Sequence, residues 1–68
     1  MTIVLNGEAR DLEPGTTVRA LLDSLEVPGE ARGVAVAVDA EVVPRGQWGT
    51  TKLDDGAQVE IVRAIQGG

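Results

Sequence analysis

Cysteine and histidine are both absent from this 68-residue chain. Without cysteine there is no disulfide framework and no thiolate, and without histidine the commonest metal ligand and general base is missing. We therefore expect no metal site. Serine occurs once, at Ser24, and the chain has no glycine-rich phosphate-binding loop with its lysine. Because no nucleophile can pair with a base, we do not expect the chain to be an enzyme.

Aromatic residues, long apolar runs and positive charge are also scarce. Trp48 is the only aromatic residue, so the core must consist of small aliphatic side chains, and branched ones favour sheet. The longest apolar run, Val34 to Val38, is far short of the roughly 20 residues that cross a bilayer. Residues 1–6 carry no basic leader of a signal peptide. A net charge of −5 opposes binding to polyanions. We expect a cytoplasmic protein without nucleic-acid or membrane partners.

The first half of the chain predicts a hairpin followed by a helix. Thr2 to Leu5 is rich in β-forming residues, Asn6-Gly7 is a strong two-residue turn signal, and Glu8 to Leu12 is expected to return as the second strand. Thr17 is a candidate helix N-cap, and Pro28-Gly29 ends the helix. The apolar residues at three- and four-residue spacing on this helix are Val18, Leu21, Leu22 and Leu25.

The second half predicts further strands. Val34 to Val38 has no polar residue on either face, which indicates a strand flanked on both sides or covered on one side by a partner. Asp39-Ala40 is a predicted turn into a short strand from Glu41 to Val43. Another short extended piece is expected from Thr50 to Leu53, and the last strand from Gln58 to Ile65.

This order of elements predicts an α+β fold made of one domain. A hairpin, one main helix and then several strands suit the β-grasp (ubiquitin-like) roll, a mixed sheet of four to five strands packed on that helix. The first and last strands would lie side by side at the sheet centre. We expect residues 1–65 to form the domain and residues 66–68 to form a flexible C-terminal tail.

The most informative part of the chain is the diglycine Gly67-Gly68 at its end. Glycine has no Cβ, so such a tail fits a channel too narrow for any side chain. From Gln66 to Gly68 it could extend about 10 Å, at roughly 3.3–3.6 Å per residue. The alternative interpretation is a frayed terminus without function.

Five other residues have candidate roles and simpler explanations. Trp48 could anchor a partner, but a lone tryptophan in a small domain more often seals the core, and we expect it there. Arg45 is expected to be solvated beside a turn. Asp54-Asp55 precedes a glycine and lacks the ligand count of a calcium loop, so we interpret it as a turn. Lys52, the only lysine, is expected to be an exposed side chain.

Several segments together resemble the ThiS family of sulfur carrier proteins of thiamine (thiazole) biosynthesis. The segment from Val42 to Trp48, with its Pro44-Arg45-x-x-Trp48 pattern, is the most discriminating, because ubiquitin-like carriers such as the molybdopterin-synthase small subunit share the others. The shared segments are Asn6-Gly7, Gly15 to Val18 with Leu21-Leu22, and Asp55-Gly56 before Val59 to Val62 and the diglycine.

This resemblance implies a function that depends on partner enzymes. An E1-like adenylyltransferase of the ThiF type would activate the Gly68 carboxylate with ATP, a sulfur donor protein would supply sulfur to give a thiocarboxylate, and a ThiG-type thiazole synthase would take it. A C-terminal carboxylate is ionised at neutral pH and is a poor electrophile, so activation must come first. The chain would be a protein co-substrate that binds no cofactor, since the partner uses the ATP.

One surface and two alternative functions complete the expectations. Val62 and Ala64 lie on the outward side of the last strand, where they could form an apolar patch that docks the activating enzyme, unless both are covered within the domain. A molybdopterin-synthase small-subunit-like carrier would donate sulfur to a different acceptor. A ubiquitin-like protein tag or binding module would instead form isopeptide bonds to lysines of other proteins.

Overall fold

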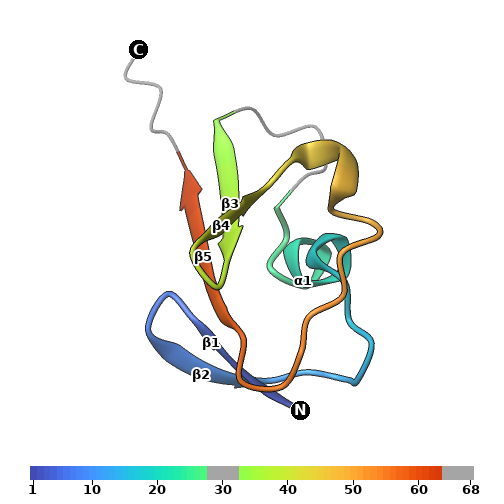
Figure 1. The fold of residues 1–68 in the computed structure, drawn as a ribbon, viewed down its shortest axis with the longest axis vertical. Coiled ribbons are helices and arrows are strands. Elements are labelled where there is room, and N and C mark those ends of the chain that lie inside the picture. Colours follow the sequence, from blue (N-terminus) through green and yellow to red (C-terminus); the bar gives the residue numbers. More distant parts are fainter. Residues whose placement is uncertain (28–32, 64–68) are drawn as a thin grey trace.

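Five strands form one mixed sheet in the computed structural model, which describes residues 1–27 and 33–63 (Figure 1). The sheet order is β2-β1-β5-β3-β4. The elements in chain order are β1 (Thr2–Leu5), β2 (Glu8–Asp11), α1 (Val18–Ser24), β3 (Val34–Val38), β4 (Glu41–Val43), the 3₁₀ turn η1 (Arg45–Gln47) and β5 (Gln58–Arg63). This is the predicted α+β arrangement of a sheet and one helix.

The first and last strands are neighbours, as predicted. β1 pairs in parallel with β5, with Val4 opposite Gln58 and Leu5 opposite Val59. β5 pairs on its other side with β3 in the antiparallel direction, from Val38 opposite Val59 to Val34 opposite Arg63. The two outer strands, β2 and β4, complete hairpins with β1 and β3. The strand that ends at Arg63 is therefore the central strand of the sheet.

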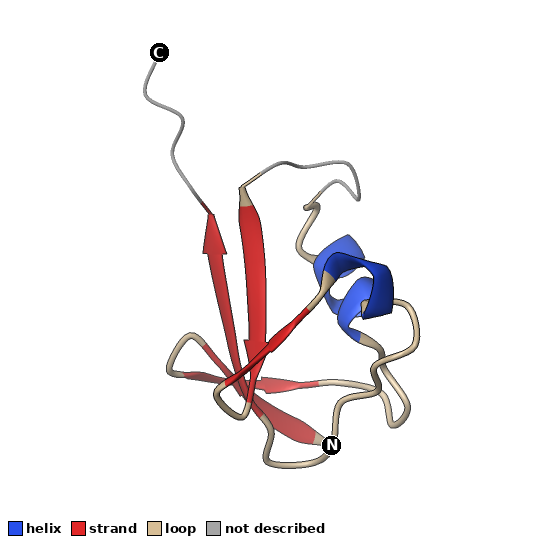
Figure 2. Cartoon of the chain, turned by 45° about the horizontal axis from the view of Figure 1, so that its top comes forward, coloured by secondary structure: helices blue, strands red, loops and turns tan. Residues whose placement is uncertain are grey.

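α1 begins where the sequence predicts and packs on one face of the sheet (Figure 2). Thr17 has extended backbone angles, and its side-chain oxygen accepts a hydrogen bond from the Ala20 N–H at 3.1 Å, which confirms it as the N-cap. Within the described residues, α1 has only seven residues, and no helix there is long and apolar enough to cross a membrane.

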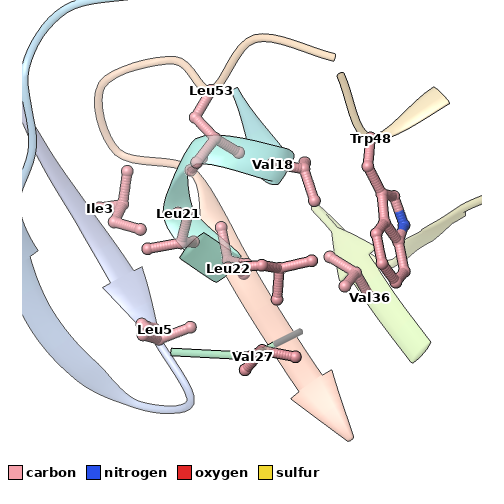
Figure 3. Packing of buried hydrophobic residues seen from close by; sticks show 11 residues of the cluster. Ile3, Leu5, Val18, Leu21, Leu22, Val27, Val36, Trp48 and Leu53 are labelled. Carbon is pink, nitrogen blue, oxygen red and sulfur yellow. The ribbon is translucent and has the colours of Figure 1, made fainter. Parts of the chain in front are cut away.

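The core lies between α1 and the sheet (Figure 3). Trp48 is 2% exposed, and its indole Nε1–H donates to the Val43 carbonyl at 2.9 Å, so the prediction of a core tryptophan is confirmed. This hydrogen bond satisfies the one polar group that an indole brings into a core. The buried apolar residues are Ile3, Leu5, Val18, Leu21, Leu22, Val27, Val36, Trp48, Leu53, Ala57 and Val59.

Two segments differ from the prediction. β2 ends at Asp11, although the Leu12 N–H still donates to the Met1 carbonyl at 2.8 Å. The extended piece expected from Thr50 to Leu53 is not a strand and makes only one bridge, between Thr17 and Lys52. The partner, Thr17, is the N-cap of α1, and the chain becomes helical immediately after it, so the pairing does not extend into a ladder. β5 is described as far as Arg63, and the last two residues of the strand predicted to Ile65 lie outside the described residues.

Candidate functional site

The candidate site is built around the C-terminal end of β5. Of the residues that the sequence assigned to the tail and to its docking surface, the structure describes only Val62, which lies on β5 and is 60% exposed. The predicted tail, Gln66, Gly67 and Gly68, and the second patch residue, Ala64, lie outside the described residues. The competing expectation that Val62 is covered within the domain does not hold in the described structure.

Val62 lies with three other apolar residues on the sheet face opposite α1, which also carries the exposed Glu60, opposite Ala37. In the described part of the chain, no helix covers that face (Figure 2). Val62 lies opposite Ala35, and Ala37 lies opposite Val42, which is 73% exposed. We call Ala35, Ala37, Val42 and Val62 the open-face patch. It extends across three neighbouring strands, β5, β3 and β4.

The open-face patch explains the uniformly apolar sequence of β3. Val36 on the inner face is 1% exposed, whereas Ala35 on the outer face is exposed and Ala37 is half-buried. The sequence left open whether β3 is covered on both faces within the domain or on one face by a partner. Among the described residues, no helix covers its outer face (Figure 2). The sequence analysis did not identify Ala35, Ala37 and Val42 as members of the patch. The signal for the two alanines was that neither face of β3 carries a polar residue.

Two turn residues hold β5 from opposite sides. Asn6, in the turn after β1, donates its backbone N–H to the Val59 carbonyl at 2.9 Å, and its Oδ1 accepts from the Ile61 N–H at 2.9 Å. Asp39, in the turn after β3, donates its backbone N–H to the Gln58 carbonyl at 2.8 Å, and its Oδ1 accepts from the Gln58 N–H at 3.0 Å. The sequence identified both residues as turn formers but gave no sign that their side chains contact β5.

Arg45 and Arg19 both contact the ring of Trp48. Arg45 is exposed, as predicted for a solvated arginine, yet its guanidinium carbon lies 4.9 Å from the ring centroid. The guanidinium carbon of Arg19 lies 5.4 Å from the same centroid, and its Nε lies 3.8 Å from Asp23 Oδ1. Such cation–π contacts support a buried ring. They give the discriminating Pro44-Arg45-x-x-Trp48 segment a structural role.

The other candidates have structural roles or none. Asp55 Oδ1 accepts from the Thr2 N–H at 2.8 Å, and the Ala57 N–H donates to the Asp54 carbonyl at 3.0 Å, so both aspartates belong to a turn, as predicted. Lys52 is exposed. No group of three or more metal-ligating side chains occurs among residues 1–27 and 33–63.

Comparisons with known proteins agree on one family. A model described as the ThiS family matches residues 3–68. The chain is 35% identical over 68 residues to the sulfur carrier protein ThiS of Escherichia coli, with both proteins covered completely. It is 41% identical to part of a thiazole synthase of Paramagnetospirillum magneticum, of which it spans only 20%. The crystal structure of a thiamine biosynthesis protein (ThiS) from Geobacter metallireducens superposes with a TM-score of 0.82 at 30% identity, with both chains covered completely.

Proposed function

The chain belongs to the ThiS family of sulfur carrier proteins of thiamine biosynthesis, and we propose that the carboxylate of Gly68 carries the sulfur. In this proposal, an adenylyltransferase of the ThiF type transfers AMP from ATP to the Gly68 carboxylate and releases pyrophosphate. Sulfur supplied by a donor protein at the sulfide oxidation level then attacks the acyl carbon, the bond to AMP breaks, and a thiocarboxylate remains. A thiazole synthase of the ThiG type takes the sulfur for thiazole formation.

The match of the ThiS family over residues 3–68, which include the diglycine, carries this proposal. The chemistry of the chain supports it. No cysteine is present to carry a persulfide, so the terminal acyl group is the reasonable attachment point for sulfur. The carboxylate needs a leaving group before sulfur can attack, and the chain offers no nucleophile paired with a base for that step. The chain therefore acts as a co-substrate in the proposed reaction, with no bound cofactor of its own.

We further propose that Val62, together with Ala64, forms part of the surface that docks the adenylyltransferase. The support is the exposure of Val62 beside three other apolar residues of the open-face patch, close to the end of β5. In the proposed arrangement, residues 1–65 form the docking domain and residues 66–68 enter the partner's active site. Because the activation step consumes ATP, we place the reaction in the cytoplasm.

A thiazole synthase is the proposed acceptor partner. The support is that the thiazole synthase of Paramagnetospirillum magneticum contains a segment 41% identical to this chain. A carrier segment and a synthase within one protein would place the sulfur donor at a high effective concentration beside its acceptor.

Intact-protein mass spectrometry tests the proposed carrier chemistry. After incubation of the 68-residue chain with its cognate adenylyltransferase, ATP and a sulfur source, the mass should rise by about 16 Da, because one oxygen of the terminal acyl group is replaced by sulfur. A chain lacking Gly68, shown to be folded by circular dichroism, is the control and should not change. No mass change in the full chain with an active cognate enzyme contradicts the proposal. Adducts on lysines of other proteins would favour the protein-tag function instead.

A further inference from the structure

The side chain of Asn6 replaces a peptide group in the pairing of β1 with β5. β1 ends at Leu5, because the chain turns away through Asn6, whose φ is +48°, and Gly7, whose φ is +85°. Parallel ladders have evenly spaced hydrogen bonds, in which one residue donates to the opposite strand and accepts from it two residues further on. Asn6 donates its backbone N–H to Val59, so the regular partner of the Ile61 N–H would be the backbone carbonyl of Asn6.

The observed partner of the Ile61 N–H is instead the side-chain oxygen of Asn6, at 2.9 Å. The Asn6 Nδ2 also donates to the Ile61 carbonyl, at 3.3 Å. The carboxamide therefore offers both an acceptor and a donor to one residue of β5, whereas a longer β1 would supply them from two successive peptide groups. The pairing on this side of β5 continues to Ile61, although β1 itself pairs only as far as Val59.

This pairing reaches the part of β5 from which the chain continues toward its proposed working end. Ile61 is two residues before Arg63, the last residue of β5. On the other side, β3 pairs with β5 up to Arg63. With Asn6 in place, β5 has partners on both sides at Ile61, so its direction at that point is restrained from two sides.

We propose that Asn6 is a positioning residue for adenylation of the C-terminal carboxylate: its carboxamide sets the direction in which β5 presents the C-terminal residues to the adenylyltransferase. This inference rests on the proposed function. Asn6 touches neither ATP nor the reacting carboxylate in this account. It acts through Ile61, by reducing the conformational freedom that docking would otherwise have to remove.

Asp39 provides a matched control within the same molecule. It also has a positive φ, of +50°, it also donates its backbone N–H to β5, and its side-chain oxygen also accepts from a β5 amide. Its contact is at Gln58, the first residue of β5 and the one farthest from Arg63. Loss of the Asp39 side chain therefore removes a similar hydrogen bond but leaves the C-terminal end of the strand restrained.

The test compares Asn6→Gly with Asp39→Gly, because glycine keeps the left-handed turn in both variants and removes only the side chain. The first readout is amide hydrogen exchange by NMR in the free proteins. In N6G the Ile61 amide should exchange about fivefold to tenfold faster relative to the Leu22 amide of the core, which reports global opening. In D39G the Gln58 amide should accelerate and the Ile61 amide should not. Asn6→Asp keeps the acceptor for the Ile61 N–H and should restore most of its protection.

The second readout is ATP–pyrophosphate exchange by the cognate adenylyltransferase, at a temperature where thermal melts show every variant folded. N6G should lower kcat/KM for the carrier about threefold to tenfold, N6D should recover part of the loss, and D39G should stay within about twofold of the wild type. If kcat/KM falls equally in N6G and D39G, the positioning role is overturned. The same holds if kcat/KM is unchanged in N6G while the wild-type chain is active; the proposed function stands in both cases. A wild-type chain that supports no exchange with an active enzyme overturns the proposed function and the positioning role with it.

Discussion

At the scale of single residues, the two hairpin turns have the same backbone geometry but different chemistry. Both central residues have positive φ in each turn: Asn6 and Gly7 after β1, and Asp39 and Ala40 after β3. Two-residue turns of this kind match the twist of the strands and favour Asn-Gly or Asp-Gly. Ala40, with φ of +69°, is the one position of the four where a Cβ is forced into the left-handed region without a polar side chain to compensate.

Ala40→Gly should therefore stabilise the protein. Removing the left-handed strain gains about 1 kcal/mol, and the greater freedom of glycine in the unfolded chain offsets part of it. We expect a net gain of about 0.5 kcal/mol, which raises the thermal midpoint by about 2–4 °C in a domain of this size. Differential scanning calorimetry or a circular dichroism melt measures the shift.

Ala9→Gly is the control for this substitution. Ala9 lies in β2 opposite Val4 and is exposed, so glycine there relieves no strain and should lower the midpoint instead. If A40G and A9G lower the midpoint equally, the strain at Ala40 does not contribute to stability.

At the scale of elements, α1 is too short to be stable by itself. It has seven residues, whereas isolated helices shorter than about 12–15 residues are marginal in water. Two things stabilise it here: the Thr17 cap, and the burial of Val18, Leu21 and Leu22 against the sheet. A helix of seven residues has few internal hydrogen bonds, so the bond to the Thr17 cap is a large fraction of those that stabilise it.

Thr17→Ala should lower the free energy of unfolding by about 1 kcal/mol, because the Ala20 N–H loses its acceptor. The thermal midpoint should fall by about 4–8 °C. Thr17→Ser keeps the hydroxyl and should retain most of the stability, which separates the cap from the lost methyl group of this half-buried residue. A T17S variant as unstable as T17A would assign the effect to packing and contradict the capping role.

At the scale of the whole molecule, the fold has two unequal sheet faces. α1 and the loop that carries Trp48 and Leu53 supply the core on one face, while the open-face patch leaves apolar side chains exposed on the other. Large apolar side chains exposed together, here Val42 and Val62 beside the charged Glu60, are typical of interaction sites with a polar rim. The central position of β5 places this surface beside the strand that leads toward the proposed thiocarboxylate end.

Val62→Asp should weaken adenylation without unfolding the protein. A carboxylate buried against an apolar partner surface without a hydrogen bond is costly, so KM for the carrier should rise about tenfold or more. The far-UV circular dichroism spectrum should stay native, because Val62 is exposed in the free chain. Steady-state ATP–pyrophosphate exchange measures the effect.

Ala20→Asp is the control for added negative charge. Ala20 is exposed on α1, on the covered side of the sheet, and lies in the first turn, where an acidic residue is favourable for the helix. It should leave adenylation near the wild-type rate. Unchanged kinetics in V62D, or an equal loss in A20D, would remove the support for docking at Val62.

Local sequence signals predicted much of the fold because they act over a few residues. Asn6-Gly7 and Asp39-Ala40 identified both hairpin turns, and Thr17 identified the start of α1. Contacts between distant parts of the chain had no such signal. The Asn6 side chain reaches Ile61, 55 residues away, and Arg19 contacts the Trp48 ring, which no periodicity could reveal.

The sequence by itself determined the two hairpin turns, the start of α1 and its apolar face, because each depends on residue type and short spacing. The family followed from several such segments taken together. The exposure of Val62 was decided only by the tertiary structure. An apolar strand can be covered on both faces or on one, and this depends on how many elements pack on the sheet. In the described residues a single helix covers one face, so Val62, Val42 and Ala35 remain exposed on the other. The same packing brings Asn6 beside Ile61, because the first and last strands pair only when the whole sheet has formed.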